Sequence, residues 1–489
     1  MMLKRLGCLC AAALMAASHT VLIPPTRAVD FIIDPETIVV ALAEEIPNIA
    51  EGSECADPNY LAGPGDAGGG DWQNERADGP YDSEEDAIQD AVDGASAGDT
   101  IFLCSGHWDF GGVVEIDKDL NIVGAGQSAT ILDGGDTHMI FTTWIVRGDP
   151  AVYSGYALNL SDMTLQHAYS GTGAAYFHEE SSIVRCTFRL NRSENIGGAL
   201  EAGSLLVEDS LFQENHSNWS GGAIFASSLQ ITGTRFIGNS NIFAGDGNDD
   251  ASGGAISFSN SLTIDDSEFR NNRAENNEDG MNFAWPFGEG GWGYGGAIFG
   301  LPGQMSITNT KFYGNTSGSG GAVYVMWAGE QSIVGNTFVG NIASSAEGQG
   351  GAIRLSAVTN QTYIVKNTFS SNKAWQGGAV SLNDTGESAD ESWNATVKQN
   401  RFSRNLATGS GGALHFALDN SGRVATRYIS RNLFSRNRAE VGGAIVIESN
   451  FGRESQIFRR FTRSLRLNRF MGNQAKTVRW SRNIGVHFD

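Results

Sequence analysis

The sequence predicts an all-β protein: a single-stranded right-handed parallel β-helix with three strands per coil and an N-terminal capping α-helix. Three observations lead to this fold class. A Phe is followed three residues later by an Asn ten times between Phe188 and Asn473, at intervals of 24 to 43 residues. A Gly-Gly-Ala-(Ile/Leu/Val) element occurs nine times between such pairs. Gly and turn residues interrupt every run that is long enough for a packed helix, which excludes helical repeats of similar length.

The chain begins with a predicted secretory signal peptide at residues 1–28, because Lys4 and Arg5 precede an apolar run and a small residue ends the segment at Ala28. We therefore expect export. Residues 29–78 are predicted to form an N-terminal extension or linker. Residues 79–170 are expected to cap the β-helix and form its first coils, and residues 171–489 to carry the repeats of the same β-helix.

The predicted cap is an amphipathic helix from Ser83 to Gly94. Ser83 is a good N-cap, three acidic residues follow it in the first turn, and Ile88 and Val92 lie on one apolar face. Gly94 then ends the helix. Such a cap is needed because a β-helix otherwise exposes the open end of its core.

Each repeat offers three short strands: one at Gly-Ala-Ile, one around a branched aliphatic five residues before Phe, and one around Phe that ends at Asn. The Phe and the aliphatic residue are expected to face inward, and the Asn to form a turn. A small polar column two residues before Phe predicts a stacked turn ladder, in which side chains of successive coils hydrogen-bond along the axis and Asn tolerates left-handed backbone angles. Cys186 fits this column by size. The predicted structural ladder includes the following pairs: Phe212 and Asn215, Phe236 and Asn239, Phe338 and Asn341, Phe369 and Asn372.

Composition limits the function. The formal net charge of −22 argues against nucleic acid and anionic membranes as partners, although residues 451–489 carry nine Lys or Arg against two acids. That basic end is interpreted either as a docking segment for an acidic partner or as a solvated terminal coil. No run after the signal peptide reaches the ~20 apolar residues of a membrane span.

The cap helix followed by Gly98-Asp99-Thr100-Ile101 resembles the start of many pectate-lyase-like β-helix proteins. In that setting Cys104, at the end of the first strand, is well placed to hold the preceding segment through a disulfide with Cys55. The buried position expected for Cys186 indicates a structural thiol.

The combined Phe-x-x-Asn and Gly-Gly-Ala-Ile motifs resemble the polymorphic outer-membrane protein repeat family, over about residues 182–473. This resemblance implies a β-helix of a surface or secreted protein, often with a role in adhesion. Family members that are held in the outer membrane carry a C-terminal β-barrel, whereas this sequence ends at Asp489 soon after the last repeat. We therefore expect a secreted protein, or one loosely associated with the cell envelope or outer membrane.

Two insertions interrupt the repeats at the same turn of consecutive coils, and we expect them to lie side by side. The first is acidic, and its Asp246, Asp249 and Asp250 are interpreted either as a Ca²⁺ site or as an acidic turn. The second is aromatic, and its rings either bind a glycan or a partner surface or fold back onto the β-helix. The predicted binding residues in the second insertion are Phe283, Trp285, Phe287, Trp292 and Tyr294.

We interpret the protein as a monomeric scaffold for adhesion or surface interaction that needs no cofactor, with a cell-surface protein or glycan as partner. A pectate-lyase-like enzyme or glycan-binding β-helix is the alternative. The residues after each Gly-Gly-Ala-Ile element, which run from Glu201 to His415, share no chemistry, and their acid and base lie five coils apart. This pattern favours a protein without catalytic activity.

Overall fold

The computed structural model describes residues 61–62, 84–147, 152–243, 251–276, 293–301, 303–327, 329–356, 361–384, 394–418, 427–449, 464–477 and 484–487. The chain divides into two compact units, Met1–Glu54 and Cys55–Asp489, and every described residue belongs to the second. The predicted signal peptide lies outside the described residues. So does all of the predicted linker except Leu61 and Ala62.

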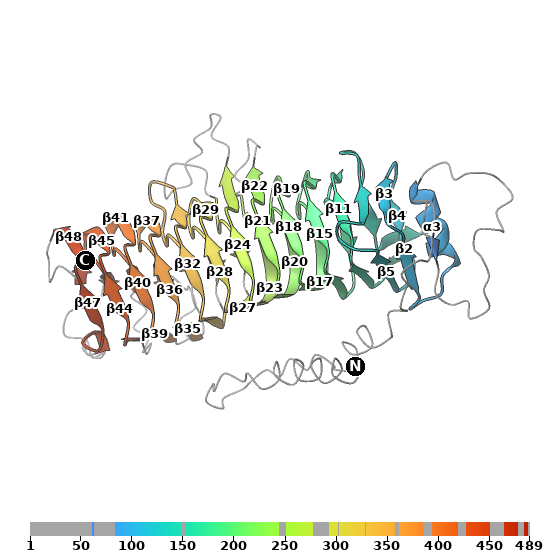
Figure 1. The fold of residues 1–489 in the computed structure, drawn as a ribbon. Coiled ribbons are helices and arrows are strands. Elements are labelled where there is room, and N and C mark those ends of the chain that lie inside the picture. Colours follow the sequence, from blue (N-terminus) through green and yellow to red (C-terminus); the bar gives the residue numbers. More distant parts are fainter. Residues whose placement is uncertain are drawn as a thin grey trace, which may run out of the picture. The chain divides into compact units, whose positions relative to one another are not determined.

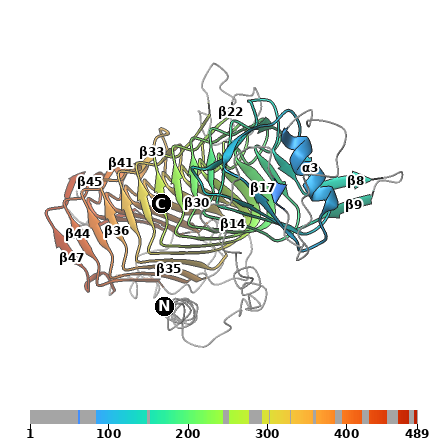
Figure 2. The same cartoon turned by 45° about the vertical axis from the view of Figure 1, so that its right-hand side comes forward.

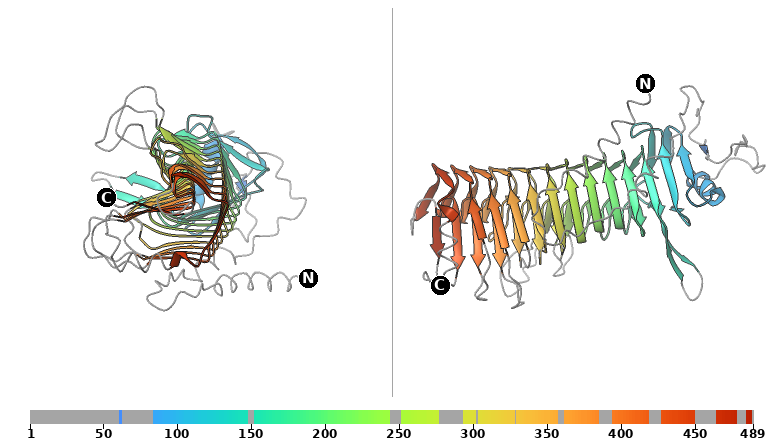
Figure 3. Two further views of the ribbon diagram at one scale, coloured as in Figure 1. Left: turned by 90° about the vertical axis from the view of Figure 1, so that its left-hand side faces the viewer. Right: turned by 90° about the horizontal axis from the view of Figure 1, so that it is seen from below.

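The second unit is a parallel β-helix in which three sheets run along one stack of coils (Figure 1). Seen from the side in Figure 3, the strands of successive coils lie next to one another in order of sequence. The predicted fold class is confirmed. In the described residues every strand pair is parallel except two, β1 with β2 and β8 with β9.

The long sheet has 23 strands in the described part of the chain. Its strands are β1 (Leu61–Ala62), β2 (Thr100–Leu103), β4 (Val114–Glu115), β5 (Leu120–Gly124), β7 (Phe141–Thr142), β10 (Leu158–Ser161), β13 (Ala175–Phe177), β14 (Ser181–Val184), β17 (Leu200–Glu208), β20 (Ile224–Thr232), β23 (Ile256–Asp265), β26 (Ile298–Gly300), β27 (Gln304–Thr308), β30 (Val323–Met326), β31 (Gln331–Val334), β34 (Ile353–Ser356), β35 (Gln361–Val365), β38 (Val380–Asp384), β39 (Asn394–Lys398), β42 (Leu414–Leu418), β43 (Arg427–Ser430), β46 (Ile445–Ser449) and β49 (Ile484–His487).

The phenylalanine sheet contains the Phe of each repeat. Its 13 described strands are β3 (Gly106–Asp109), β6 (Thr130–Asp133), β11 (Thr164–Gln166), β15 (Thr187–Arg189), β18 (Leu211–Gln213), β21 (Arg235–Ile237), β24 (Glu268–Arg270), β28 (Lys311–Tyr313), β32 (Thr337–Val339), β36 (Thr368–Ser370), β40 (Arg401–Ser403), β44 (Leu433–Ser435) and β47 (Arg469–Met471).

The narrow sheet follows the Asn of each repeat. Its 11 described strands are β12 (Tyr169–Ser170), β16 (Arg192–Ser193), β19 (His216–Ser217), β22 (Ser240–Phe243), β25 (Arg273–Asn276), β29 (Thr316–Ser317), β33 (Ile342–Ala343), β37 (Lys373–Gln376), β41 (Leu406–Ser410), β45 (Arg438–Val441) and β48 (Gln474–Thr477). A separate hairpin is formed by β8 (Trp144–Arg147) and β9 (Val152–Gly155).

The division of each coil into strands differs from the predicted one. The Gly-Ala-Ile strand and the strand around the aliphatic column belong to the same sheet, and in β17, β20 and β23 they are one continuous strand. The third sheet comes instead from residues after Asn. The chain turns at the residue before Asn, as at Leu190 (φ 58°) and Glu214 (φ 54°), so a new strand begins directly after the Asn. The turn predicted at the Asn therefore lies one residue before it, and the Asn itself is buried.

A continuous stack of Phe rings fills the core beside the phenylalanine sheet. From Phe188 to Phe470 successive rings are 4.6–5.2 Å apart, with planes within 12° of parallel. Isolated aromatic pairs prefer offset or edge-to-face contacts. The in-register strands, ~4.8 Å apart, hold the rings parallel at centroid distances within the usual range of such contacts, about 4.5–7 Å, and burial of the rings adds to the stability of the stack.

Two hydrogen-bonded ladders flank this stack. In the ladder after Phe, Asn215 donates its backbone N–H and its Nδ2 to Oδ1 of Asn239, at 3.0 and 2.9 Å. Its Nδ2 also donates to the carbonyl of Phe188 at 2.9 Å. The ladder before Phe runs from the Cys186 N–H, which donates to Ser210 Oγ at 3.1 Å, to a series of Asn side chains. Both ladders satisfy polar groups that the core would otherwise leave unpaired.

The cap and the cysteines stabilise the N-terminal part of the β-helix. Helix α3 (Glu84–Gly94) packs the fully buried Ile88 and Val92 on the first coil, and Figure 2 shows it at this end. Cys104 forms a disulfide bond. Cys55, its predicted partner, lies outside the described residues, and the pairing stays a prediction. Cys186 is a free thiol, and its burial raises its pKa to about 12, so it is protonated and unreactive at neutral pH.

Candidate functional site

Most predicted site residues of the two insertions lie outside the described residues: Asp246, Asp249, Asp250, Phe283, Trp285, Phe287 and Trp292. The strands from which the insertions depart are neighbours, since β22 pairs with β25 in register from Ser240 to Phe243. The described aromatic residue, Tyr294, packs on the β-helix. Its ring lies 4.9 Å from that of Tyr324 and 6.0 Å from that of Phe299.

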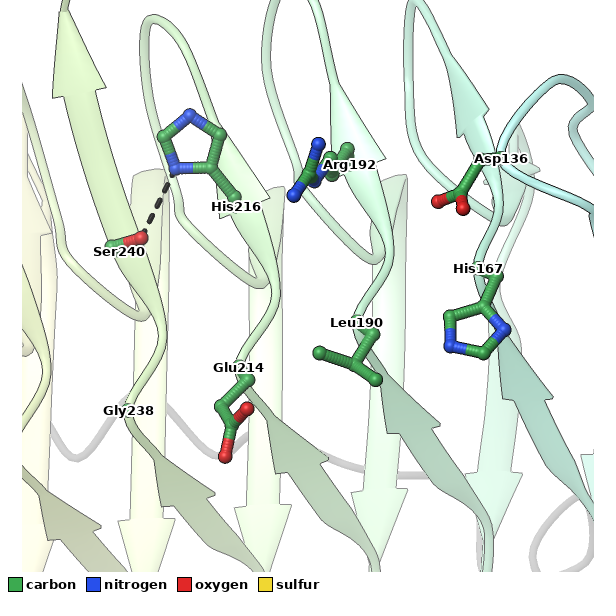
Figure 4. A pocket seen from close by; sticks show the side chains of 8 residues that line it. All are labelled: Asp136, His167, Leu190, Arg192, Glu214, His216, Gly238 and Ser240. Atoms are coloured by element: carbon green, nitrogen blue, oxygen red, sulfur yellow. Dashed lines mark hydrogen bonds between the residues drawn. The ribbon is translucent and has the colours of Figure 1, made fainter.

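A groove of about 670 Å³ lies on the outer side of the corner between the phenylalanine sheet and the narrow sheet. Its lining comes in steps from consecutive coils, as Figure 4 shows. The lining residues are Asp136, His167, Leu190, Arg192, Glu214, His216, Gly238 and Ser240. Because each coil advances ~4.8 Å, a ligand that runs along the axis meets the same two backbone positions again at every step.

The local fold explains why these side chains face outward. His167, Leu190 and Glu214 occupy the same left-handed corner on consecutive coils. The residue after each of them is buried: Ala168, Asn191 and Asn215. Arg192 and His216 are the first residues of β16 and β19, one position after the ladder Asn. Because the Asn is buried, the residue before it and the residue after it point outward. Leu190, for example, is 40% exposed.

The groove mixes hydrogen-bond donors with acceptors. Burial lowers the pKa of His216, and the nearby charge of Arg192 lowers it further. Hydrogen bonds with Asn218 and Ser240 raise the pKa, but their effect is smaller. His216 is therefore neutral at neutral pH, and its Nδ1 lies 3.0 Å from Ser240 Oγ. Arg192 and Glu214 are exposed charges of opposite sign on adjacent coils.

A polar network extends from the groove across the first coils. Asp133 Oδ2 accepts from Gln166 Nε2 at 2.5 Å and lies 2.9 Å from His167 Nδ1 and 3.3 Å from His107 Nε2. Arg189 Nε continues the network by donating to Gln166 Oε1 at 2.6 Å. Burial alone would raise the pKa of Asp133, but hydrogen bonds from Gln166, Gly135 and His167 together lower it. Asp133 thus holds His167 in place at the wall of the groove.

Replacing Asp133 with Asn is expected to lower the free energy of unfolding at pH 7 by about 1–3 kcal/mol, because a carboxylate with charge-assisted bonds is lost. The folded-state pKa of Asp133 lies below its ordinary value of 3.8. Its contribution is therefore full above pH 3.8 and is lost as the pH falls through the folded-state pKa. Urea unfolding of both proteins between pH 7 and pH 3 checks this. A deficit of the variant that stays constant down to pH 3 contradicts it.

The carboxylates of the groove are too far apart for a hydrolytic pair. Asp136 and Glu214 lie three coils apart. Asp136 donates its N–H to the carbonyl of His167, which follows β11 on the next coil. The coils of β15 and β18 come after it, and Glu214 follows β18. At the strand spacing this separation is ~14 Å. Glycoside hydrolysis uses two carboxyl groups about 5–9.5 Å apart.

A Ser-His-Glu chain is present elsewhere but is buried. Ser381 Oγ lies 3.2 Å from His415 Nδ1, and His415 Nε2 lies 3.3 Å from Glu448 Oε2, on three consecutive coils of the long sheet. Ser381 is 0% exposed and His415 is 1% exposed. Because β38 pairs on both sides, its backbone N–H groups are used in the sheet and are not available as an oxyanion hole. The burial of Ser381 keeps a substrate carbonyl away from its hydroxyl. We interpret this series of Ser, His and Glu side chains as structural.

Sequence reasoning missed the groove. Its residues occupy two positions beside the Asn ladder that vary freely from repeat to repeat, so no single motif marks them. A signal was nevertheless present. Several repeats have Gly at the position before Asn, whereas the early repeats have Leu190 and Glu214 there. The left-handed conformation of this position costs non-Gly residues about 1 kcal/mol or more.

One segment of the repeats matches a known repeat family. Residues 209–227 match the sequence model of the Chlamydia polymorphic membrane protein (Chlamydia_PMP) repeat. The matched segment contains Phe212, Asn215 and one Gly-Gly-Ala-Ile element, so the predicted resemblance is confirmed at the motifs on which it rested. A search of curated proteins finds no significant match.

Solved β-helix structures are similar over most of the chain at low identity. The catalytic unit of a thermostable GH87 α-1,3-glucanase from Streptomyces thermodiastaticus strain HF3-3 aligns with TM-score 0.42 and 12% identity, over 81% of this chain and 67% of that one. A mannuronic acid-specific polysaccharide family 6 lyase from human gut microbiota gives 0.44 and 11%, over 83% and 89%. PfbA, a surface adhesin of Streptococcus pneumoniae, gives 0.35 and 13%, over 75% and 83%.

No helix in the described ranges has the length and apolar character needed to cross a membrane. Within the same ranges, no group of three or more His, Cys, Asp or Glu side chains is arranged to hold a metal ion.

Proposed function

We propose that this protein is an exported β-helix that acts at the cell surface by binding, without catalysis, and that the groove from Asp136 to Ser240 holds an extended glycan. The observation that carries the proposal is the groove itself. It offers donors and acceptors at each coil and lies along the axis of the repeat. The PMP-type repeat supports a surface location.

The chemistry of the lining favours a glycan. Sugar hydroxyls both donate and accept hydrogen bonds, which suits a wall where Arg192 donates, Glu214 accepts and neutral His216 does both. The exposed Leu190 adds an apolar patch for a sugar ring. The adjacent aromatic insertion is proposed to extend this surface, because the two insertions leave β22 and β25, and β22 begins with the groove residue Ser240.

The double variant Arg192→Ala/His216→Ala tests the groove. We expect at least ten-fold weaker binding of short neutral and uronic-acid oligosaccharides by isothermal titration, since two hydrogen-bonding side chains at about 1 kcal/mol or more each are removed. Lys373→Ala is the matched control, because Lys373 is the exposed first residue of β37, at the same backbone position as Arg192. Equal binding by the double variant and the control contradicts the proposal.

A deletion variant lacking Asn276–Trp292 separates the insertion from the groove. If the aromatic insertion is part of the site, the deletion weakens binding while the unfolding midpoint stays near that of the wild type. If binding depends only on the deleted segment and not on Arg192 and His216, the ligand site lies on the insertion instead of in the groove.

The alternative function is a uronate lyase, and its test is direct. Polygalacturonate or alginate incubated with the protein and Ca²⁺ is expected to give no rise in absorbance from unsaturated product. The reason is that a pectate-lyase-type site holds Ca²⁺ on carboxylates of adjacent coils, whereas the two carboxylates of the groove, Asp136 and Glu214, lie three coils apart. Steady product formation that the Arg192→Ala/His216→Ala variant abolishes overturns the proposal of binding without catalysis.

A further inference from the structure

We propose that the last coils of the phenylalanine sheet bind an anionic lipid surface through an arginine face, defined as Arg401, Arg404, Arg431, Arg436 and Arg469. This inference does not depend on the groove, which lies on the first coils. It concerns how the protein associates with a membrane surface.

The arginine face is built by the register of the sheet. Arg401, Leu433 and Arg469 follow one another in one outward column of β40, β44 and β47, the terminal strands of this sheet in Figure 1. Arg404 and Arg436 occupy the left-handed corner before Asn on consecutive coils, at φ 56° each. Arg431, at φ 58°, occupies the opposite corner of the same strands. All five side chains are exposed.

These arginines lack partners within the described part of the chain. None of the five forms an ion pair with a described residue, whereas Arg185, Arg270 and Arg273 each pair with a carboxylate. The acidic residues described between 394 and 477 are Glu440, on the narrow sheet, and Glu448, which contacts His415. The outward columns of the last three strands of the phenylalanine sheet contain no acid.

Backbone geometry adds to this observation. At the corner before Asn, other coils use Gly238, Gly314 or Gly340, for which the left-handed conformation carries no penalty. Arg404 and Arg436 stand there at an energetic cost. The opposite corner carries acids on the early coils, at Asp162, Asp209 and Asp266, beside one Arg that pairs with Asp162. From Asn309 onward this corner has no acid in the described coils, and it includes Lys366 and Arg431. Basic residues are therefore concentrated on the last coils.

Exposed apolar side chains next to the arginines favour a lipid surface over a soluble polyanion. Leu467 is 65% exposed and Met471 is 48% exposed on the last coil. Leu467 accepts a backbone hydrogen bond from Arg431 at 3.2 Å, and Met471 follows Ser435 in the outward column. Basic residues beside apolar ones characterise interfacial membrane binding. A net charge of −22 does not prevent this, because charges more than about 8 Å from the lipid are screened at physiological ionic strength.

The experiment measures sedimentation of the full chain with vesicles of phosphatidylcholine alone or with one third phosphatidylglycerol. We expect binding to the anionic vesicles only, weakened by added salt. The variant Arg401→Ser/Arg469→Ser should bind about 25-fold more weakly, since each basic residue near an anionic surface contributes about five-fold. Both residues are exposed, so far-UV circular dichroism should be unchanged.

The matched control is Arg235→Ser/Lys311→Ser, which removes two exposed charges from the same outward column in the middle of the β-helix. It changes the net charge equally and should bind like the wild type. Equal loss in both variants overturns the proposal, because binding then follows net charge. Binding to neutral vesicles, or binding to soluble heparin without binding to anionic vesicles, also overturns it.

Discussion

Replacing Asn341 with Leu is expected to lower the free energy of unfolding by about 3–6 kcal/mol. Asn341 Oδ1 accepts the N–H and the Nδ2 of Asn315, each at 3.0 Å, and its own Nδ2 donates to the carbonyl of Phe312 at 3.1 Å. Leucine removes one partner from each of these three buried groups, at about 1–3 kcal/mol each, although Asn315 Nδ2 keeps its bond to the carbonyl of Phe269. Urea unfolding followed by far-UV circular dichroism measures the loss.

Two further variants show that the loss comes from hydrogen bonds. Asn260→Ala changes an exposed Asn and should stay within about 0.5 kcal/mol of the wild type. The Nδ2 of Asn341 also donates to Asn372 Oδ1 at 3.0 Å. Asn341→Asp should therefore be strongly destabilised at pH 7 and recover in part at low pH, because only the protonated carboxyl can donate to Asn372 Oδ1. An Asn341→Leu variant as stable as Asn260→Ala would show that the ladder does not stabilise the fold.

Replacing Phe338 with Ala is expected to lower the free energy of unfolding by about 3–5 kcal/mol, the usual cost of such a truncation in a core. The Phe338 ring is fully buried between Phe312 at 4.6 Å and Phe369 at 4.9 Å. Strand register keeps these neighbours from closing the gap, so a cavity remains. Urea unfolding measures the effect.

The control for this prediction is Phe470→Ala. Among the described residues Phe470 is the last ring of the stack, with Phe434 at 5.2 Å, and it is only partly buried. Its truncation should cost clearly less than that of Phe338. Equal losses at the two positions contradict the view that stacking on both faces makes the inner rings more important.

The fold could be predicted from sequence because its determinants recur. Phe212, Phe236 and Phe338 stand in one column of the sequence and in one ring stack of the structure. The polar column from Cys186 to Asn468 likewise forms one hydrogen-bonded ladder. Because the parallel strands pair in register, residues at the same position of successive repeats become neighbours in space. Helix α3 was predictable from its N-cap and its apolar face.

The groove could not be predicted, because its residues carry no repeated chemistry. Arg192 and His216 occupy one backbone position but are different residue types, and only the structure shows that they share a wall with Asp136. The residues that follow each Gly-Gly-Ala-Ile element show a second limit. Their direction is not evident from the sequence, and three of them, Ser381, His415 and Val446, are each at most 1% exposed in the structure. Alternation within a strand shows which residues share a side and does not show whether that side meets solvent.

Hydrogen exchange with and without bound oligosaccharide tests the central claim most directly. The best ligand of the oligosaccharide panel is added at saturation, and exchange is read in peptides along the whole chain. The account predicts added protection in the segments around Leu190–Glu194, Glu214–Asn218 and Gly238–Phe243, which form the groove and its edge. Protection confined to coils beyond β29, or no oligosaccharide that binds at all, would contradict it.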